Sequence, residues 1–394
     1  MVRFFCSILL IAFGGMSAAQ EFSGNIAAES LIFSGPGLDS RQMDDNITLS
    51  FKPKWTGEWN DGDDAWSAEI FLRADNKDEG REHADIRELL WLRLDGDNEW
   101  RVGINTMFWG VTESQHLVDV INQIDQVEGV DGEDKLGQPM IHLKRYQDWG
   151  VLDFLVLPGF RERTFRAIEG RPRLPLVVDS SQVLYESSDK DRHVDYAMRF
   201  SQTYDDLDIG ITLFKGTNRD PQLIPGVDAN GNNVLIPRYV QMTQLALDAQ
   251  LIYEDWIWKL ELINRDTSEP SFQALTGGFE YTFYGIFESD IDLGSIAEYS
   301  YDSRGPGDRG VFDRDLFLGA RLAFNDVQSS ELLAGVFYDT EKGSQSFRLE
   351  GNRRIGDSWK GTIEMQLFSN IDPADPLLAF EKDDFLLLEL AKFF

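Results

Sequence analysis

The feature that most constrains the fold is a pair of alternating runs at residues 244–264, QLALDAQLIYEDWIWKLELIN, separated by Glu254 and Asp255. In each run, large apolar side chains share one parity and mostly polar side chains share the other. Successive side chains of a β-strand point to opposite faces of the sheet. The sequence therefore predicts a β-hairpin with one apolar face and one largely polar face.

Such a hairpin fits either a soluble sandwich, whose apolar face is the core, or a membrane barrel, whose apolar face meets lipid. Recurrence of the pattern favours the barrel. We expect an all-β fold, a single antiparallel transmembrane β-barrel of about 18 strands (16–18). The expected strands are 22–33, 46–58, 65–74, 84–94, 100–108, 140–147, 150–157, 193–204, 207–216, 239–253, 256–265, 272–286, 291–301, 315–324, 331–339, 345–354, 359–369 and 384–394.

The connections between these segments alternate between short and long. Short Asp/Asn/Gly-rich turns include 60–63, 95–98, 147–149, 205–206, 254–255, 325–328 and 356–358, whereas the long set includes 110–139, 160–192, 217–238, 302–314 and 370–383. In bacterial outer-membrane barrels the short turns are periplasmic and the long loops are extracellular. We expect the same orientation, with both termini in the periplasm.

The two faces are clear in the segment that starts at Trp359. Trp359, Ile363 and Leu367 share the parity expected to face lipid, and Lys360 and Glu364 share the parity expected to face the lumen. Aromatic residues bracket many of the apolar stripes, as they do at membrane interfaces.

The first residues resemble a secretory signal. Arg3 precedes the apolar run 4–13 and small residues end at Ala19, so residues 1–19 are expected to be a signal peptide and 20–394 the barrel. The single cysteine, Cys6, lies in that segment, and the mature chain would have no disulfide. No uninterrupted run of about 18 apolar residues follows, which excludes a helical membrane protein.

The last ten residues, FLLLELAKFF, end on Phe394 with Leu386, Leu388 and Leu390 in alternation. This ending resembles the C-terminal signature of Gram-negative outer-membrane barrels, which the barrel-assembly machinery recognises; Lys392 departs from it. Trp109-Gly110 followed by 118–122 (VDVIN) is similar to a pattern in uncharacterised porin-like outer-membrane families of proteobacteria. The resemblance implies a barrel in the cell outer membrane, in contact with lipid and lipopolysaccharide, and implies no substrate.

The formal net charge of −31 excludes nucleic acid and anionic lipid as expected partners. The acidic residues either form a solvated surface, or bind divalent cations beside lipopolysaccharide in the outer loops, or bias a pore toward cations. A small-molecule solute, a homo-oligomer or a periplasmic partner remain possible partners.

The long loop 110–139 is the expected constriction. Thr112 and Gln115 fit a capping box, and apolar residues from Leu117 to Ile124 recur at helical spacing, so a short amphipathic helix is expected at 113–124, packed against the inner wall or over the mouth. Glu113 and Asp119 are its charged candidates.

The next long loop concentrates arginines in an otherwise acidic chain. These arginines are Arg161, Arg163, Arg166, Arg171 and Arg173. They either form local ion pairs with Glu162 and Glu169, or form a series of positive charges (an arginine ladder) at the mouth or constriction that attracts anionic solutes. Parity nominates lumen-lining charges that could oppose them, namely Glu69, Arg73, Arg101, Arg199, Lys259, Glu261, Arg321, Arg348, Glu350 and Glu364.

Patterns for catalysis or metal binding are weak. Ser114, His116 and Asp119 are close in sequence but have no matching oxyanion donor, and the four histidines show no metal-ligand spacing. The acidic run 131–134 is interpreted as a surface turn. We therefore expect no enzyme, no metal and no cofactor.

The sequence predicts an outer-membrane porin-like channel for passive diffusion of small polar or charged solutes, with the 110–139 loop constricting the pore. One alternative is an export or docking component for a lipid or polymer transport system. Another is a barrel-embedded hydrolase, which would need a histidine–serine pair. Because no separate domain precedes the first expected strand, a plugged transporter is not expected.

Overall fold

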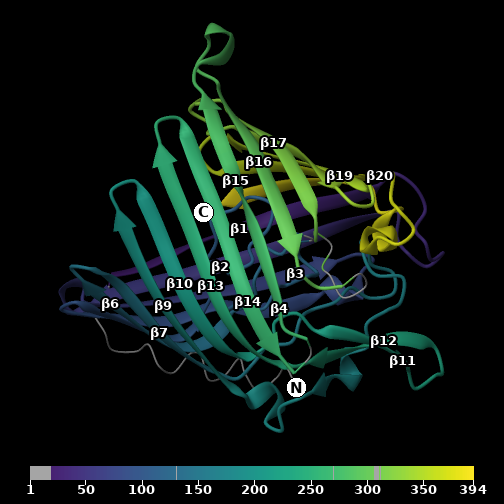
Figure 1. Ribbon diagram of the computed structural model, residues 1–394, viewed down its shortest axis with the longest axis horizontal. Coiled ribbons are helices and arrows are strands. Elements are labelled where there is room, and N and C mark those ends of the chain that lie inside the picture. Colours follow the sequence, from purple (N-terminus) through teal and green to yellow (C-terminus); the bar gives the residue numbers. More distant parts are fainter. Residues whose placement is uncertain (1–18, 130, 269, 306–309, 311) are drawn as a thin grey trace.

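The computed structural model shows a closed barrel of 18 antiparallel strands (Figure 1). It describes residues 19–129, 131–268, 270–305, 310 and 312–394. The expected signal peptide lies outside the described residues except for Ala19, which begins the first strand. No helix in the described ranges has the length and apolar character needed to cross a membrane.

The barrel strands match the 18 expected segments one for one. They are β1 (Ala19–Phe33), β2 (Asp45–Trp59), β3 (Asp64–Asp75), β4 (His83–Asp95), β5 (Asn98–Asn105), β6 (Gln138–Gln147), β7 (Gly150–Pro158), β9 (Val194–Tyr204), β10 (Leu207–Thr217), β13 (Gln241–Tyr253), β14 (Trp256–Thr267), β15 (Phe272–Phe283), β16 (Asp292–Asp302), β17 (Asp315–Ala323), β18 (Glu331–Asp339), β19 (Gln345–Ile355), β20 (Trp359–Ser369) and β21 (Phe385–Phe393).

Each barrel strand pairs with the next one along the chain, and β1 pairs with β21 to close the sheet. That closing register runs without a break from Asn25 opposite Phe393 to Phe33 opposite Phe385. Closure removes the free edges that an open sheet would expose.

The two faces of the sheet have opposite chemistry, as the sequence predicts. Leu245 and Leu318 point outward and are 52% and 53% exposed, whereas Glu261 points inward and is 0% exposed. The outward apolar side chains form a band around the barrel instead of meeting a second sheet. Exposed apolar surface of this extent marks a lipid or protein contact surface.

Aromatic side chains gather at both ends of this band. At the end of the barrel that carries the β13–β14 turn, Trp256 and Trp258 stack with ring centroids 5.6 Å apart, and the ring centroids of Phe22 and Phe394 are 5.4 Å apart. Toward the other end, the exposed rings include those of Tyr196, Tyr299 and Tyr338. Aromatic girdles of this kind flank the apolar band of membrane barrels.

We call the end that carries the β13–β14 and β19–β20 turns the short-turn end, and the end that carries the β5–β6 and β7–β9 connections the long-loop end. The lengths do not separate completely, because β15–β16 at the short-turn end is longer than β14–β15 and β18–β19 at the long-loop end. Outside the barrel, a small sheet combines β8 (Leu184–Tyr185), β11 (Gln222–Val227) and β12 (Asn233–Tyr239), which come from two long connections. The helical pieces among the described residues are short 3-10 turns: η1 (Asn60–Gly62), η2 (Glu79–Arg81), η3 (Ser180–Gln182), η4 (Lys190–Arg192), η5 (Ile286–Glu288) and η6 (Pro376–Phe380).

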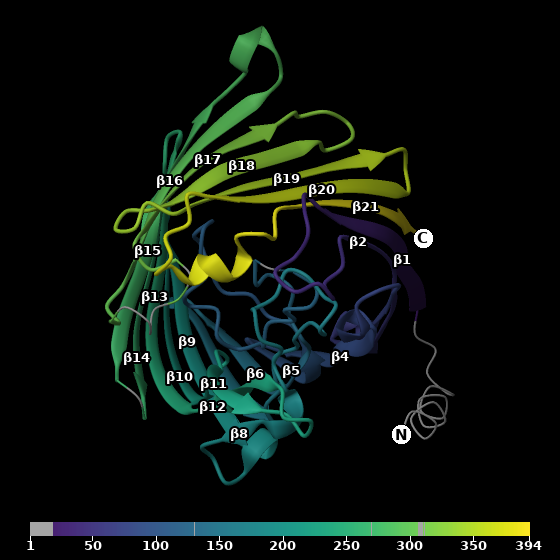
Figure 2. The same cartoon turned by 90° about the vertical axis from the view of Figure 1, so that its right-hand side faces the viewer.

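Several long connections fold back into the barrel, so that the view in Figure 2 shows chain segments inside the ring of strands. The β5–β6 connection, residues 106–137, contacts the inner wall, and we call it the inner loop.

Candidate functional site

The inner loop is fastened to the inner wall by a buried carboxylate on β14. Glu261 accepts hydrogen bonds from the backbone N–H groups of Val111 at 2.8 Å, Thr112 at 3.2 Å and Val118 at 3.1 Å. A buried carboxylate needs such donors, and a loop inside the barrel needs acceptors for its N–H groups. The pairing satisfies both requirements at once.

A second strand carboxylate holds the next residues of the inner loop. Glu298 on β16 accepts from the backbone N–H of Glu113 at 2.9 Å and of Ser114 at 2.8 Å, and from the Ser114 hydroxyl at 2.6 Å. Residues 111–118 are therefore held against β14 and β16.

Apolar side chains of the inner loop complete this attachment. Val120 and Ile121 pack with wall residues that include Leu155 and Phe214, and Val118 packs with Ile263. Each buried aliphatic side chain contributes about 1.5–3 kcal/mol relative to exposure. The prediction that this loop packs against the inner wall agrees with these contacts.

The expected helix at 113–124 is wrong. The inner loop has no helix there. The N–H of Val118, which in that helix would donate to the carbonyl oxygen of Ser114, donates instead to Glu261, while the N–H groups of Glu113 and Ser114 donate to Glu298. The Thr112 hydroxyl contacts the carbonyl oxygen of Gln115 rather than capping a helix. The spacing of the apolar residues indicated which side of this segment packs against the wall, but it did not predict the backbone conformation.

Further along, the inner loop forms a narrow hairpin directed at the opposite wall. Ile124 and Lys135 form an antiparallel bridge, and the N–H of Asp125 donates to the carbonyl oxygen of Asp134 at 2.8 Å. Near the hairpin's tip, Asp131 accepts from Arg348 of β19 at 2.6 Å. Asp131, in the run 131–134 interpreted as a surface turn, therefore contacts a wall arginine inside the barrel, while Glu133 and Asp134 are exposed.

Between the inner loop and strands β17–β20 lies a space lined by ionisable groups, which we call the charged gap. Two ion pairs cross it, Glu113 with Arg321 and Asp131 with Arg348, both at 2.6 Å. A cavity of ≈ 30 Å³ adjoins it, lined in part by Glu113, Glu133, Arg348 and Glu350. Glu364 lies opposite Glu350 in the β19–β20 register.

Carboxylates outnumber cations around the charged gap. Among the described residues, the carboxylates are Glu113, Asp131, Glu133, Glu280, Glu350 and Glu364, and the cations are Lys259, Arg321 and Arg348. Where these carboxyl groups are ionised, a narrow passage with this balance would favour cations.

Two carboxyl groups of the inner loop, those of Glu133 and Asp134, have raised pKa values. Partial desolvation inside the barrel, reinforced by the nearby charge of Asp131, raises the pKa of Glu133 to about 7 and that of Asp134 to about 6, although both residues keep exposed surface. Both groups therefore gain negative charge as pH rises through the neutral range.

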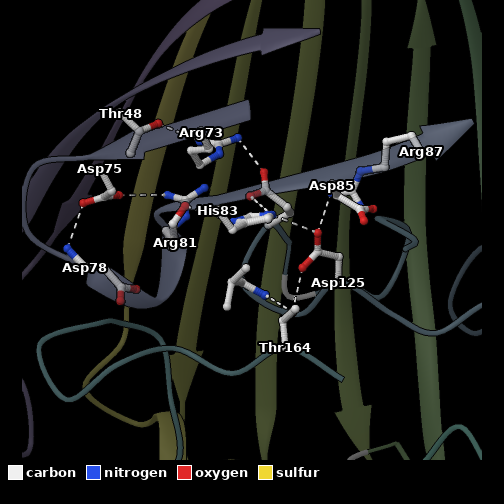
Figure 3. Close-up of polar contacts among 12 residues, drawn as sticks. Thr48, Arg73, Asp75, Asp78, Arg81, His83, Asp85, Arg87, Asp125 and Thr164 are labelled. Carbon is white, nitrogen blue, oxygen red and sulfur yellow. Dashed lines mark hydrogen bonds and ion pairs between the residues drawn. The ribbon is translucent and has the colours of Figure 1, made fainter. Parts of the chain in front are cut away.

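On another side of the lumen, a network of arginines and carboxylates joins β1–β4 to the loops inside the barrel (Figure 3). Arg73 bonds to Glu29 at 3.1 Å and to Glu128 at 2.6 Å, and Arg87 contacts Asp125. Thr164 donates to Asp125 at 2.6 Å, so the loop after β7 joins the same network.

The five arginines of the β7–β9 connection each form an ion pair with an aspartate from another segment. Arg161 contacts Asp85 at 2.7 Å, Arg163 contacts Asp220 at 2.6 Å, Arg166 contacts Asp78 at 3.5 Å, Arg171 contacts Asp383 at 2.7 Å and Arg173 contacts Asp39 at 3.6 Å. These pairs tie the loop to its neighbours. A role in attracting anionic solutes stays a prediction.

Three potential metal-ligand atoms converge in the network of Figure 3. His83, Asp125 and Glu128 have ligand atoms within 4.8 Å of one another. The spacing of the histidines in the sequence did not predict this group, because two of its three members are carboxylates. Arg87 and Arg73 already neutralise those carboxylates, so the arrangement suits loop attachment better than a cation.

Three other sequence-predicted lumen residues on the inward parity form ion pairs with residues that do not border the charged gap. Glu69 pairs with Lys54 at 3.7 Å, Arg101 with Glu99 at 2.6 Å and Arg199 with Asp248 at 2.6 Å. Lys259 lies 3.9 Å from Glu113, at the edge of the gap.

Sequence reasoning missed Glu298, Glu280, Asp131 and Glu133 as site residues. The first two lie on the inward parity of their strands, and parity alone could have nominated them.

Ser114, His116 and Asp119 do not form a hydrogen-bonded relay. Ser114 donates to Glu298, Asp119 pairs with Lys135 at 3.0 Å, and the His116 ring packs on Phe108 at 4.7 Å. Burial lowers the pKa of His116 to about 4, so this imidazole is neutral at pH 7.

No protein-family model and no curated protein matches the sequence. The resemblance to a proteobacterial family therefore stays a prediction. Solved structures do match over nearly the whole chain.

One similar structure is a loop-deletion form of OmpT, an outer membrane protein of Vibrio cholerae, with 8% identity and a TM-score of 0.49 over 96% of this chain and 100% of that one. A mutant of Rh. blastica porin shares 10% identity with a TM-score of 0.45, over 95% and 100%. OprB of Pseudomonas putida also shares 10%, with a TM-score of 0.45, over 95% and 94%. Identities this low show no shared function.

The expectation that the chain is not an enzyme is wrong, because an enzymatic activity is not excluded. The similar structures include three of OmpT alongside porins, and likeness at 8–9% identity neither assigns nor removes an activity. Enzymatic status is therefore left open.

Proposed function

We propose that this protein is an outer-membrane channel of porin type that conducts small solutes by passive diffusion and prefers cations. The observation that carries the proposal is the inner loop, which Glu261 and Glu298 hold against one wall so that a charged gap borders the opposite wall. A loop fixed in this way narrows a barrel that would otherwise enclose a wide aqueous lumen.

The outward apolar band and its aromatic girdles support a place in the outer membrane, with lipid and lipopolysaccharide around the barrel. Delivery by the barrel-assembly machinery is part of the proposal, since Leu386, Leu388 and Leu390 alternate along β21. A homo-oligomer is part of the proposal, since one similar OmpT structure is described as the trimer form.

The export alternative would be favoured by a lateral seam between the first and last strands. The unbroken β1–β21 register gives that alternative no support. The hydrolase alternative would need a histidine–serine pair on the lipid face, and the described histidines offer no such hydrogen-bonded pair.

The experiment is a conductance measurement on purified protein in planar lipid bilayers under a KCl gradient. The proposal predicts channel currents with a reversal potential of the sign for K⁺ preference. Absence of conductance from folded protein would contradict the channel, and preference for Cl⁻ would contradict the assignment of the charged gap as the selective region.

A further inference from the structure

A cavity of ≈ 200 Å³ lies on the long-loop side of the charged gap, and we call it the aromatic cavity. Phe337 of β18, Phe368 of β20, Phe385 of β21 and Phe380 of η6 line it together with Phe312. Arg348 and Asp131 line its polar end and also border the charged gap. A solute that enters from the long-loop end through this cavity therefore meets aromatic rings before it meets the gap.

The rings are held in place by packing and by the local chain. Phe312 and Phe337 stack with centroids 4.3 Å apart, and Phe368 lies 6.4 Å from Phe380. The turn η6 is capped by Asp375, whose carboxylate accepts from the N–H of Leu377 at 2.9 Å. The aromatic lining is thus pre-organised, which reduces the entropy lost on binding.

At the polar end, one carboxylate and one guanidinium, Asp131 and Arg348, line the cavity, and the carboxyl groups of Glu133 and Glu350 lie just beyond it in the adjoining cavity. The single guanidinium of Arg348 contacts two carboxylates, Asp131 and Glu350. The buried Ser346 hydroxyl also lines the aromatic cavity and makes no hydrogen bond within the described residues.

Aromatic faces attract cations through their quadrupoles, and carboxylates attract them through charge. We propose that the aromatic cavity binds organic ammonium cations with an apolar or aromatic body before they cross the charged gap. The site deepens the proposed function, since it names a solute class for the same channel. The volume suits a molecule with one ring, because a cavity of about 150 Å³ holds benzene.

The test measures binding directly, so that it stands apart from conductance. Phenethylammonium is titrated into the folded protein in detergent and its affinity is measured by calorimetry. Phenylacetate, an anion of similar shape, and K⁺ are the comparison ligands. The inference predicts saturable binding of phenethylammonium at one site and at least about ten-fold weaker binding of phenylacetate.

Variants locate the site. Phe380→Ala and the milder Phe368→Leu are each expected to weaken phenethylammonium binding about three- to ten-fold. Phe287→Ala serves as the control, because Phe287 is 92% exposed on the β15–β16 turn and should leave affinity unchanged. Circular dichroism checks that each variant is folded.

Equal affinity for phenylacetate, or unchanged phenethylammonium affinity in both cavity variants, would overturn the inference. Absence of phenethylammonium binding to folded wild-type protein would overturn it as well, even if K⁺ currents are normal. Absence of K⁺ currents with intact binding would instead overturn the channel and leave the binding site standing.

Discussion

The carboxylate of Glu261, in the middle of strand β14, accepts the backbone N–H of Val111 at 2.8 Å, across 150 residues of sequence. This contact fixes one end of the inner loop to the barrel wall, and Glu298 fixes the residues that follow. The position of the charged gap depends on these two attachments, so the first prediction concerns them.

Glu261→Ala should release residues 111–118 from the wall and raise single-channel conductance. It leaves the buried N–H groups of Thr112 and Val118 and the partly buried N–H of Val111 without their acceptor, at a cost of about 1–3 kcal/mol for each that finds no water. Bilayer recordings and thermal unfolding measure the two effects. Glu341→Ala is the matched control, since Glu341 is an exposed glutamate between β18 and β19, and an equal effect there would contradict the attachment.

Cation preference should rise with pH across the neutral range. The pKa of Asp134 is raised to about 6 and that of Glu133 to about 7, so each carboxyl is neutral below its pKa and charged above it. The ratio of K⁺ to Cl⁻ permeability is expected to increase between about pH 5 and pH 8, where both groups ionise. Glu133→Gln should flatten the upper part of the profile; a profile identical to wild type would place Glu133 outside the conducting path.

Removing the wall cation of the charged gap should strengthen cation preference. Arg348→Gln leaves Asp131 and Glu350 without their guanidinium partner, and Asp131→Asn removes one negative charge. We expect the permeability ratio for K⁺ over Cl⁻ to rise in the first variant and to fall in the second. Reversal potentials in the same KCl gradient measure both, and a shift in the same direction would refute the assigned electrostatics.

The β7–β9 connection should lose stability when its most buried arginine is removed. Arg171 is fully buried, pairs with Asp383 at 2.7 Å and lies 4.0 Å from the centre of the Phe33 ring. Removing one member of a buried ion pair costs about 3–5 kcal/mol, so Arg171→Ala should unfold at a clearly lower temperature. Arg41→Ala, at an exposed ion pair, should unfold like wild type.

Replacing arginines of the β7–β9 connection distinguishes between two interpretations of that loop. If Arg161, Arg163 and Arg166 act only as attachments, replacing all three with glutamine should leave ion selectivity unchanged while lowering stability. A shift of the reversal potential toward K⁺ would instead show that their charge reaches the solute, as the anion-attracting ladder predicts.

Parity in the sequence was enough to predict the strands, because lipid-facing and lumen-facing chemistry alternates residue by residue. Trp359 and Glu364 took their expected faces, and the even strand count makes β1 and β21 antiparallel, as the observed closure requires. Glu261 and Arg321 were likewise predicted to face the lumen, because each lies within a regular strand.

The interior of the barrel was less predictable, since it depends on contacts between distant segments. Apolar spacing at 117–124 suggested a helix, but Glu261 and Glu298 supply acceptors that a local pattern does not reveal. Asp131 was interpreted as part of a surface turn because its partner, Arg348, lies 217 residues away. Similarly, the aspartate partners of Arg163 and Arg171 belong to other loops.

The most direct test of the charged gap uses the predicted absence of cysteine from the mature chain, since Cys6 lies in the expected signal peptide. Glu133→Cys introduces one thiol at the gap, and Glu341→Cys introduces one in an exposed long-loop-end connection as the control. A cationic thiol-reactive methanethiosulfonate is added during bilayer recording. The account predicts a stepwise fall in K⁺ conductance for Glu133→Cys alone; unchanged conductance after complete labelling, verified by mass spectrometry, would contradict it.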